Sequence, residues 1–557
     1  MNYIQPVRKE KIMKASDLFI KALENEGVEY IFGIPGEENL DMLDSLRDSK
    51  IKFILTRHEQ AAAFMAATYG RLTGRAGVCL STLGPGATNL VTAIAYAQLG
   101  GMPLVVITGQ KPIKAGLQGK FQMLDIVRMM EPLVKDSDQI VYGRQIPALV
   151  RGAFRIAEEE RPGAVHLELP EDIAGEEVEN DTVFPRQTIH RVFASDRAIE
   201  KAVEAITNAK RPLLLVGAGA NRKRVRQPLS DFVNKTGIMF FNTQMGKGVL
   251  SGDDSHFIGT AAFSSKDYVH EAIKKADLII NVGHDLIEKP PFVMKGQNQK
   301  VVHINFHSAQ IKDIYYPQVE VVGNISNSMD RITDALDECF ACNREWVKPI
   351  RERIRAAIHA LDNDTSFPML PQRVVADVRK VLDDDGIVSL DNGMFKLWFA
   401  RHYHTHHPNT LLLDNALATM GAGLPAAMAC ALMYPERQVV AVCGDGGFMM
   451  NSQELETAVR LKLNMITIIF NDSAYGMIKW KQAGQGLADF ALDFNNPDFV
   501  MYAQSYGAIG HRISASDELI PTMEKAFSDG GVHVIDLPVD YSQNTKTLLN
   551  DLKQFGN

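Results

Sequence analysis

The sequence predicts an α/β protein made of three consecutive domains, each built on a parallel sheet. Short apolar runs rich in β-branched residues end repeatedly in glycine turns, as buried parallel strands do. A stretch of helix-forming residues follows most of these runs, and the order of strand, turn and helix recurs along the chain. The 557 residues are also too many for one hydrophobic core.

The first domain is expected over residues 12–180. Apolar residues at helical spacing predict a helix over 15–26, and apolar runs that end in turn residues predict the strands of a parallel sheet. These predicted strands cover residues 30–36, 52–55, 77–81, 103–108 and 164–169. A polar linker over 175–186 is expected to close the domain.

The central domain is expected over residues 190–345, with strands at 212–216, 276–283 and 301–305. Its first strand runs into Gly217-Ala218-Gly219, which superficially resembles a dinucleotide-binding fingerprint. The third glycine of that fingerprint is absent, so close packing between strand and helix is the favoured interpretation. Nucleotide binding by this domain stays an open alternative.

The third domain is expected over residues 365–550, after a charged, helix-rich connector over 344–364. Its apolar runs again predict buried strands that end in polar or glycine residues. The predicted strands cover residues 386–390, 411–414, 439–443, 465–470 and 532–538.

Two acidic residues of the third domain follow neighbouring predicted strands. Strand 439–443 ends in the turn Gly444-Asp445-Gly446, a helix is expected from about 452 to 462, and strand 465–470 ends at Asn471-Asp472. The strands of such a βαβ unit are parallel, so Asp445 and Asp472 can converge on one crevice. Carboxylates suit a magnesium ion, and the glycines let the backbone approach a phosphate. The alternative is a pair of ordinary loop acids.

Glu59 is a second candidate, in the first domain. It lies where strand 52–55 gives way to an alanine-rich helix over 61–72. In an α/β layer, a side chain at this switch faces the ligand crevice. The alternative is an acid that merely stabilises the N-terminus of the helix.

Composition bounds the partners and the compartment. A formal net charge of -8 leaves no basic patch, so nucleic acid is not expected to bind. Five cysteines without framework spacing fit a reducing compartment. No apolar run approaches the length of a membrane span, and the N-terminus has no apolar export segment. We therefore expect a soluble, cytoplasmic protein.

Several segments together resemble the large catalytic chain of acetolactate synthase, within the thiamine diphosphate enzymes, over nearly the whole length. These segments are RHEQAAAFMAATYGRLTG, STLGPGATN, RPGAVHLELPEDI, TMGAGLPAA, GDGGF, ELETAVR and PVDYSQN. The resemblance implies a pyrimidine-binding domain, a central domain and a diphosphate-binding domain, in that order. It also implies a homodimer or homotetramer, with each site between the first domain of one subunit and the third of another.

The resemblance assigns roles to residues on the cofactor side. Glu59 would hydrogen-bond the pyrimidine ring of thiamine diphosphate and stabilise the imino tautomer that removes the thiazolium proton. Met420 would be the apolar wedge that bends the cofactor. Magnesium would be held by Asp445, Asp472 and the carbonyl of Ala474. The other expected cofactor-binding residues are Gly444, Gly446, Gly447, Tyr475 and Met477.

The implied reaction decarboxylates one pyruvate, a 2-oxo acid, and joins the two-carbon unit to a second pyruvate, giving 2-acetolactate and CO2. Phe121 and Gln122 match a pair that lines the substrate side, with Lys120 as a possible support. Two alternatives remain: a 2-oxo acid decarboxylase that releases an aldehyde, and a non-catalytic regulatory chain. The retention of Glu59 and Met420 beside the two aspartates argues against the second.

The sequence departs from the pattern of the biosynthetic branch at two places, which concern flavin binding and the choice of the acceptor. Where the flavin-containing biosynthetic branch has an Arg-Phe-Asp-Asp segment, this chain has GHDLIEK over 283–289, as in the flavin-free catabolic branch. We therefore expect no FAD. The aromatic residue that favours larger acceptors is out of register, because Trp480 lies one position early and Lys481 takes its place. Pyruvate is the expected acceptor.

Overall fold

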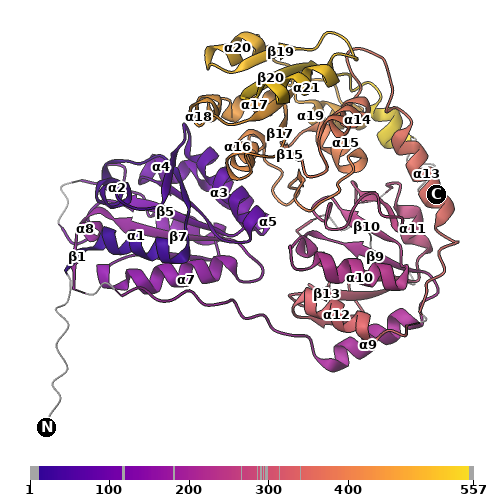
Figure 1. Cartoon of the computed structure of the whole chain (residues 1–557), viewed down its shortest axis with the longest axis horizontal. Helices are drawn as coiled ribbons and strands as arrows, with labels where there is room; N and C mark the ends of the chain where they lie inside the picture. The colour runs from indigo at the N-terminus through magenta and orange to yellow at the C-terminus, as the bar shows by residue number, and fades with distance from the viewer. Residues whose placement is uncertain are drawn as a thin grey trace. The chain divides into compact units, whose positions relative to one another are not determined.

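The computed structural model describes residues 12–115, 119–179, 182–264, 266–284, 287–288, 292, 294, 299–312, 314–338 and 340–550. The chain divides into two compact units, one up to Ile189 and the other from His190. The described residues form three six-stranded sheets, one in the first unit and two in the second, which Figure 1 shows in chain order by colour. Neighbouring strands in all three are parallel. The predicted fold class is confirmed, while the exact domain limits stay predictions.

The sheet of the first unit has the strand order β3-β2-β4-β5-β7-β6. Its strands are β2 (Tyr30–Gly33), β3 (Lys52–Leu55), β4 (Gly77–Ser81), β5 (Leu104–Gln110), β6 (Asp136–Gln139) and β7 (Ala164–Pro170). Helices α1 (Ala15–Glu26) and α7 (Ile146–Glu158) pack against it through one hydrophobic core. The sequence missed the edge strand β6, because its four residues are all polar and carry no apolar run.

The prediction of a polar linker over 175–186 is wrong for the first residues of that segment. Strand β8 (Glu177–Val178) pairs antiparallel with β1 (Met13–Lys14), so this stretch is part of a small sheet with the beginning of the domain. Two-residue strands of mixed polarity have no periodicity for a sequence pattern to detect.

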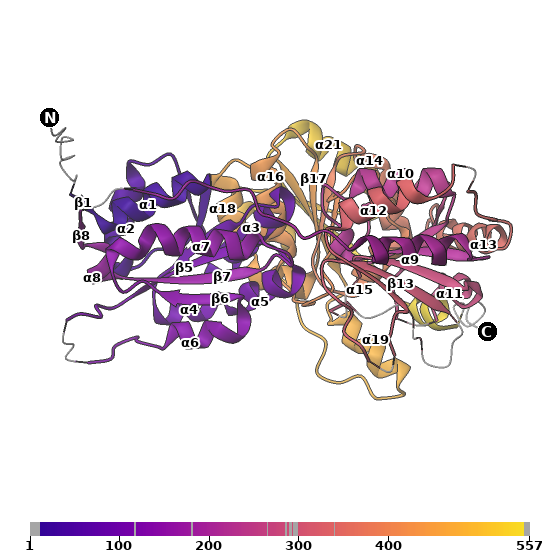
Figure 2. The ribbon, with the colours of Figure 1, turned by 90° about the horizontal axis from the view of Figure 1, so that it is seen from below.

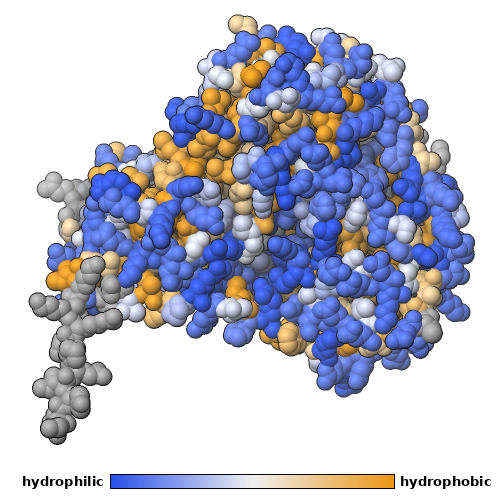
Figure 3. Space-filling view, viewed as in Figure 1, coloured by the Kyte–Doolittle hydropathy of each residue, from blue (hydrophilic) through white to orange (hydrophobic). Residues whose placement is uncertain are grey.

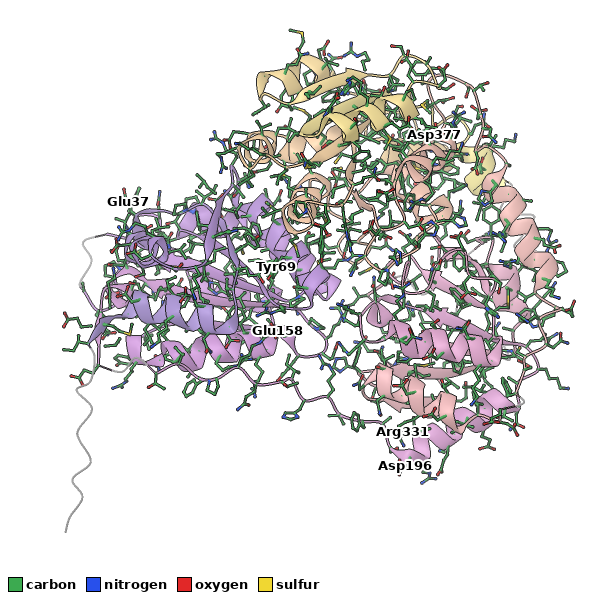
Figure 4. All side chains as sticks on the ribbon, viewed as in Figure 1. Glu37, Tyr69, Glu158, Asp196, Arg331 and Asp377 are labelled. Atoms are coloured by element: carbon green, nitrogen blue, oxygen red, sulfur yellow. The ribbon has the colours of Figure 1, made fainter. Side chains whose placement is uncertain are left out.

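The central sheet has the order β11-β10-β9-β12-β13-β14. Its strands are β9 (Pro212–Val216), β10 (Phe240–Thr243), β11 (Phe257–Ala261), β12 (Leu278–Val282), β13 (Lys300–Asn305) and β14 (Val319–Val322). Helices α9 (Asp196–Thr207), α10 (Arg226–Thr236) and α12 (Ile325–Ala335) cover one face, and α11 (His270–Lys275) and α13 (Lys348–His359) cover the other. An ion pair between Asp196 and Arg331 joins α9 to α12 (Figure 4).

The third sheet has the order β16-β15-β17-β18-β20-β19. Its strands are β15 (Ile387–Leu390), β16 (Leu411–Leu412), β17 (Val439–Gly444), β18 (Met465–Asn471), β19 (Ile509–Arg512) and β20 (Val532–Pro538). The helix expected from about 452 to 462 corresponds to α18 (Glu454–Arg460), and a further helix, α17 (Asp445–Asn451), precedes it. The expected turn is therefore wrong: α17 begins directly at Asp445, where the low helix propensity of the glycines hid it.

Side chains of the central and third domains contact each other within the second unit. The guanidinium of Arg401, on α15 (Met394–His402), donates to Asp267 over 2.9 Å, and both side chains are almost completely buried. On α19 (Gly476–Gly484), Trp480 stacks on Phe263 with ring centroids 6.4 Å apart. Helix α19 lies at the lower centre of Figure 2. These contacts make residues 190–557 one compact unit.

No helix among the described residues is both long enough and apolar enough to cross a membrane.

Candidate active site

A pocket of about 430 Å³ lies in the third domain, at the edge where β15, β17 and β18 end. Parallel strands bring their carboxyl ends to one edge, which is where ligands bind in such sheets. The nine site residues that the sequence placed in this domain all line the pocket. They are Met420, Gly444, Asp445, Gly446, Gly447, Asp472, Ala474, Tyr475 and Met477. Their position is as expected, and their roles stay predictions.

Asp445 is buried, and hydrogen bonds hold both oxygens of its carboxylate. Its Oδ1 accepts from the backbone N–H of Gly446 at 2.8 Å, and its Oδ2 accepts from the N–H of Ser473 at 2.7 Å and from Nδ2 of Asn496 at 2.8 Å. Burial raises the pKa of Asp445, although these hydrogen bonds act against that shift. The carboxylate is therefore held in one orientation at the end of β17.

Asp472 lies close enough to Asp445 for the two charges to repel each other. Burial, and then the charge of Asp445, raise the pKa of Asp472 to about 7. A cation between the two carboxylates would relieve this repulsion, and carboxylate and carbonyl oxygens are the ligands that magnesium prefers. No group of three or more His, Cys, Asp or Glu among the described residues could hold a metal by itself. A metal here would depend on backbone and cofactor oxygens beside the two aspartates.

The glycines of the pocket have no room for a side chain. A Cβ on Gly446 would lie 2.8 Å from the ring of Tyr475, and a Cβ on Gly447 would lie 2.5 Å from Oδ2 of Asp391. Such contacts are closer than real Cβ atoms make. The backbone at the start of α17 lines the pocket, and its glycines carry no side chain that would hinder the close approach of a phosphate.

The turn that carries Met420 is fixed from two sides. The N–H of Gly421 donates to both oxygens of Asp391, at 2.9 and 3.0 Å, while the carbonyl of Gly421 accepts from Asn451 at 2.7 Å. Gly421 has a φ of 87°, which favours glycine. Burial raises the pKa of Asp391 to about 6, against its backbone hydrogen bonds. The sequence missed Asp391 as a site residue, although its place directly after a strand was the available signal.

Glu59 is buried in the first unit, with 8% of its surface exposed. It is the first residue of α3 (Glu59–Thr73), two positions earlier than the predicted helix start, and His58 caps that helix by accepting from the N–H of Gln60 at 3.1 Å. Nδ2 of Asn89 donates to Oε2 of Glu59 at 2.9 Å. A Cβ on Gly86 would lie 3.3 Å from Oε1. Asn89 was not predicted as a site residue, although it is the last residue of the STLGPGATN segment.

Lys120, Phe121 and Gln122 lie in an exposed turn of the first unit, with 76% of Phe121 exposed. Gln122 has a φ of 58°, and its carbonyl oxygen would lie 2.5 Å from a Cβ on Gly84. Gly84 opens α4 (Gly84–Asn89), the helix that also carries Asn89. Gln122 and Glu59 are therefore both neighbours of α4, within the first domain.

Trp480 and Lys481 do not line the pocket of the third domain. Trp480 is buried against Phe263, and the ammonium of Lys481 lies 4.6 Å from the centre of the Trp480 ring. Lys481 itself is exposed.

The segment expected to distinguish the flavin-free branch is only partly within the described residues, since Asp285, Leu286 and Lys289 lie outside them. Glu288 is buried and sits at the turn after β9. Its carboxylate accepts from the N–H of Ala218 at 3.3 Å, the N–H of Met245 at 3.1 Å and the hydroxyl of Thr243 at 2.7 Å. One backbone donor of this turn, and one of the segment that follows β10, are thus used by a carboxylate of the chain itself.

Comparison with known families finds three matches along the chain. Residues 13–129 match "Thiamine pyrophosphate enzyme, N-terminal TPP binding domain", and residues 199–332 match the "central domain" of the same enzymes. Residues 391–537 match their "C-terminal TPP binding domain". The N-terminal match contains Glu59, and the C-terminal match contains Asp445 and Asp472.

Curated relatives cover nearly the whole chain. An acetolactate synthase of Bacillus subtilis (strain 168) is 33% identical over 548 residues, covering 98% of this chain and 96% of the relative. A catabolic acetolactate synthase of Raoultella terrigena is 32% identical over 547 residues, covering 97% of each. A putative thiamine pyrophosphate-containing protein, YdaP, of Bacillus subtilis (strain 168) is 30% identical, covering 94% and 91%.

Proposed function

The chain belongs to the thiamine pyrophosphate enzymes, and we propose that within this family it makes 2-acetolactate and CO2 from two molecules of pyruvate. The observation that carries the proposal is the pocket in which Asp445, Asp472 and Met420 lie together at the carboxyl ends of parallel strands. The relatedness to acetolactate synthases at 32–33% identity favours the carboligase among the reactions of the family.

Asp445, Asp472 and the carbonyl of Ala474 would hold Mg²⁺. The ion would neutralise the diphosphate of the cofactor, whose backbone neighbours would be Gly446 and Gly447. The two aspartates fit this task because burial and the charge of Asp445 both raise the pKa of Asp472, and a bound cation would offset both effects.

When bound, thiamine diphosphate supplies a carbon nucleophile for the 2-oxo group and an electron sink for the loss of CO2. Glu59 would hydrogen-bond the pyrimidine ring and hold or release a proton at Oε1 or Oε2. Its burial excludes water from that exchange, and the hydrogen bond from Asn89 holds Oε2 in place. Met420 would support the cofactor on a turn that Asp391 keeps rigid.

A carboligase must also delay protonation of its reacting carbon until the second oxo acid arrives. The described residues that line the pocket include no histidine and no lysine. Among them, Met450, Phe470 and Ile478 add apolar surface. The side chain of His58 is engaged with the N–H of Gln60. The apolar part of this lining supports the carboligase over a decarboxylase that releases an aldehyde.

The remaining parts of the proposal concern assembly and compartment. We propose a homodimer or homotetramer with sites between subunits, acting in the cytoplasm without FAD. Exposed apolar side chains support self-association: Met449 and Met450 on α17 are 39% and 42% exposed. Figure 3 shows apolar residues among hydrophilic ones on the part of the third domain that carries α17. Exposed apolar surface of this kind indicates a site of interaction with another protein.

Incubation of the purified protein with pyruvate, Mg²⁺ and thiamine diphosphate tests the reaction. A carboligase releases one CO2 for every two pyruvates consumed and accumulates acetolactate. A decarboxylase releases one CO2 for each pyruvate and accumulates acetaldehyde, so that result would replace the proposed function by the alternative. A regulatory chain would do neither.

A further inference from the structure

The side-chain amide of Asn496 joins the ends of two neighbouring strands at the pocket. Its Nδ2 lies 2.8 Å from Oδ2 of Asp445, which follows β17, and 3.0 Å from Oδ1 of Asn471, the last residue of β18. The amide nitrogen carries two hydrogens, so it can donate to both acceptors at once. Its third neighbour, the hydroxyl oxygen of Ser473, is farther away at 3.4 Å.

Backbone pairing places Asn496 at this point, although it lies 51 residues after Asp445. The segment after α19 folds back on the segment that follows β18, with an antiparallel bridge between Ala474 and Asp493. The N–H of Tyr475 donates to the carbonyl of Leu492 at 3.1 Å, and the N–H of Phe494 donates to the carbonyl of Ser473 at 3.0 Å. These bonds fix the chain two residues before Asn496.

The second acceptor of the amide is itself anchored. Nδ2 of Asn471 donates to Asp536 at 2.8 Å, and Asp536 accepts from Arg512 at 3.1 Å. Asn496 therefore ties Asp445 to a side chain that β20 and β19 hold in place. A neutral donor can do this without cancelling the charge of Asp445, and Oδ1, which accepts from the N–H of Gly446, keeps a lone pair that can face a cation.

We propose that Asn496 is a positioning residue for the divalent cation: it fixes the orientation of the Asp445 carboxylate relative to the end of β18, where Asp472 follows. The inference rests on the metal site of the proposed function. Partners that orient a metal-binding side chain commonly change metal affinity by about ten- to hundredfold when they are removed.

The test uses Asn496→Ala and a matched control, Asn495→Ala, which alters an exposed neighbour in the same loop. Mn²⁺ binding to the full-length protein, followed by electron paramagnetic resonance in the presence of thiamine diphosphate, measures the cation affinity directly. We expect Asn496→Ala to weaken it by about ten- to hundredfold, and Asn495→Ala to leave it unchanged. The turnover lost at low Mg²⁺ should return at high Mg²⁺, which a general folding defect would not allow.

A second variant separates positioning from packing. Asn496→Leu keeps the size of the side chain and removes both hydrogen bonds, so it should weaken Mn²⁺ binding as Asn496→Ala does. Wild-type affinity in either folded variant would overturn the inference, and so would an equal loss in the Asn495 control. If the wild type binds Mn²⁺ and the cofactor but makes no acetolactate, the proposed reaction fails while the role of Asn496 stands. A wild type that binds no Mn²⁺ would overturn both.

Discussion

The side-chain amide of Asn89 lies 2.9 Å from Oε2 of Glu59, the buried carboxyl group at the start of α3. One oxygen of Glu59 thus has a fixed donor, while a Cβ on Gly86 would crowd the other at 3.3 Å. A carboxyl group in this setting has one oxygen held in position and one kept clear by a glycine. This arrangement suits the proposed role, in which Glu59 hydrogen-bonds the ring of the cofactor.

Glu59→Gln should reduce turnover by at least about a hundredfold, because the amide cannot exchange a proton as a carboxyl group does. The affinity for thiamine diphosphate should stay nearly unchanged, since the shape of the side chain is kept. Deuterium exchange at the thiazolium carbon, followed by NMR after acid quenching, is the direct measurement. Glu37→Gln, at an exposed position of the same domain (Figure 4), is the control. Wild-type exchange in Glu59→Gln would show that Glu59 has no such role.

Asp445→Ala should abolish the metal-dependent binding of thiamine diphosphate, because Asp472 alone cannot hold the cation against the diphosphate. Calorimetric titration with the cofactor, with Mg²⁺ and then with a chelator, measures this. Asp529→Asn, which alters a surface ion pair with Lys525, should bind as the wild type does. The metal site would be wrongly placed if Asp445→Ala still bound the cofactor in a chelator-sensitive manner.

Gln122→Ala should shift the products of pyruvate from acetolactate towards acetaldehyde. A side-chain donor near the reacting carbon would bind the acceptor, so its loss impairs the second step and leaves decarboxylation intact. Chromatography of both products, together with the CO2 released per pyruvate, gives the partition. Lys114→Ala, at an exposed site of the same domain, should not alter the partition. A parallel fall of both products in Gln122→Ala would point to a role in decarboxylation instead.

The stability of the first unit should fall with acidification because of His166. Its two ring nitrogens lie 2.8 Å from the hydroxyls of Thr108 and Ser137, and burial lowers the pKa of His166 to about 3. Below the unfolded-state pKa of about 6.5, the unfolded chain binds a proton that the folded chain does not. The contribution of the neutral His166 to the free energy of unfolding is therefore fully present above that pH. As the pH falls further, the free energy of unfolding decreases by up to about 1.4 kcal/mol per pH unit, down to about pH 3.

Urea unfolding between pH 4 and pH 8 measures this contribution of His166. His166→Gln should lower stability most at pH 8 and should flatten the pH dependence. His190→Gln, at an exposed histidine, should leave the slope unchanged. An unchanged slope in His166→Gln would mean that other groups control the acid sensitivity.

The purified protein should be colourless. Glu288 already accepts from the N–H of Ala218 in the turn after β9 and from the N–H of Met245 after β10, and its negative charge would repel a dinucleotide phosphate brought to the same place. Absorbance spectra of the native protein and of an acid extract measure bound flavin. A stoichiometric flavin band would contradict this expectation and would show that the central domain accepts a nucleotide.

The parallel-sheet architecture could be predicted from the sequence because it depends on local signals. Strands β17 and β18 are continuous apolar runs, and the acids behind them follow from strand direction alone. These signals placed Asp445 and Asp472 in one pocket without any knowledge of long-range contacts.

Other parts of the site could not be predicted because they depend on contacts between distant segments. Asn496 reaches Asp445 through the backbone bridge at Asp493, and an asparagine in a loop carries no pattern that reveals this. Asp391 acts on the turn of Met420, 30 positions away from Gly421 in sequence. The start of α17 was missed for a different reason, since glycines are poor helix formers and were interpreted as a turn.

The ion pair between Arg401 and Asp267 has a consequence for recombining these domains. Both side chains are almost completely buried, so a chimera that exchanged only the central domain for one without an acid at this position would leave Arg401 without its partner in the interior. An uncompensated buried charge costs about 3–5 kcal/mol, a large share of the stability of a typical protein. The two residues must therefore be transplanted as a pair, and in evolution neither is free to change before the other.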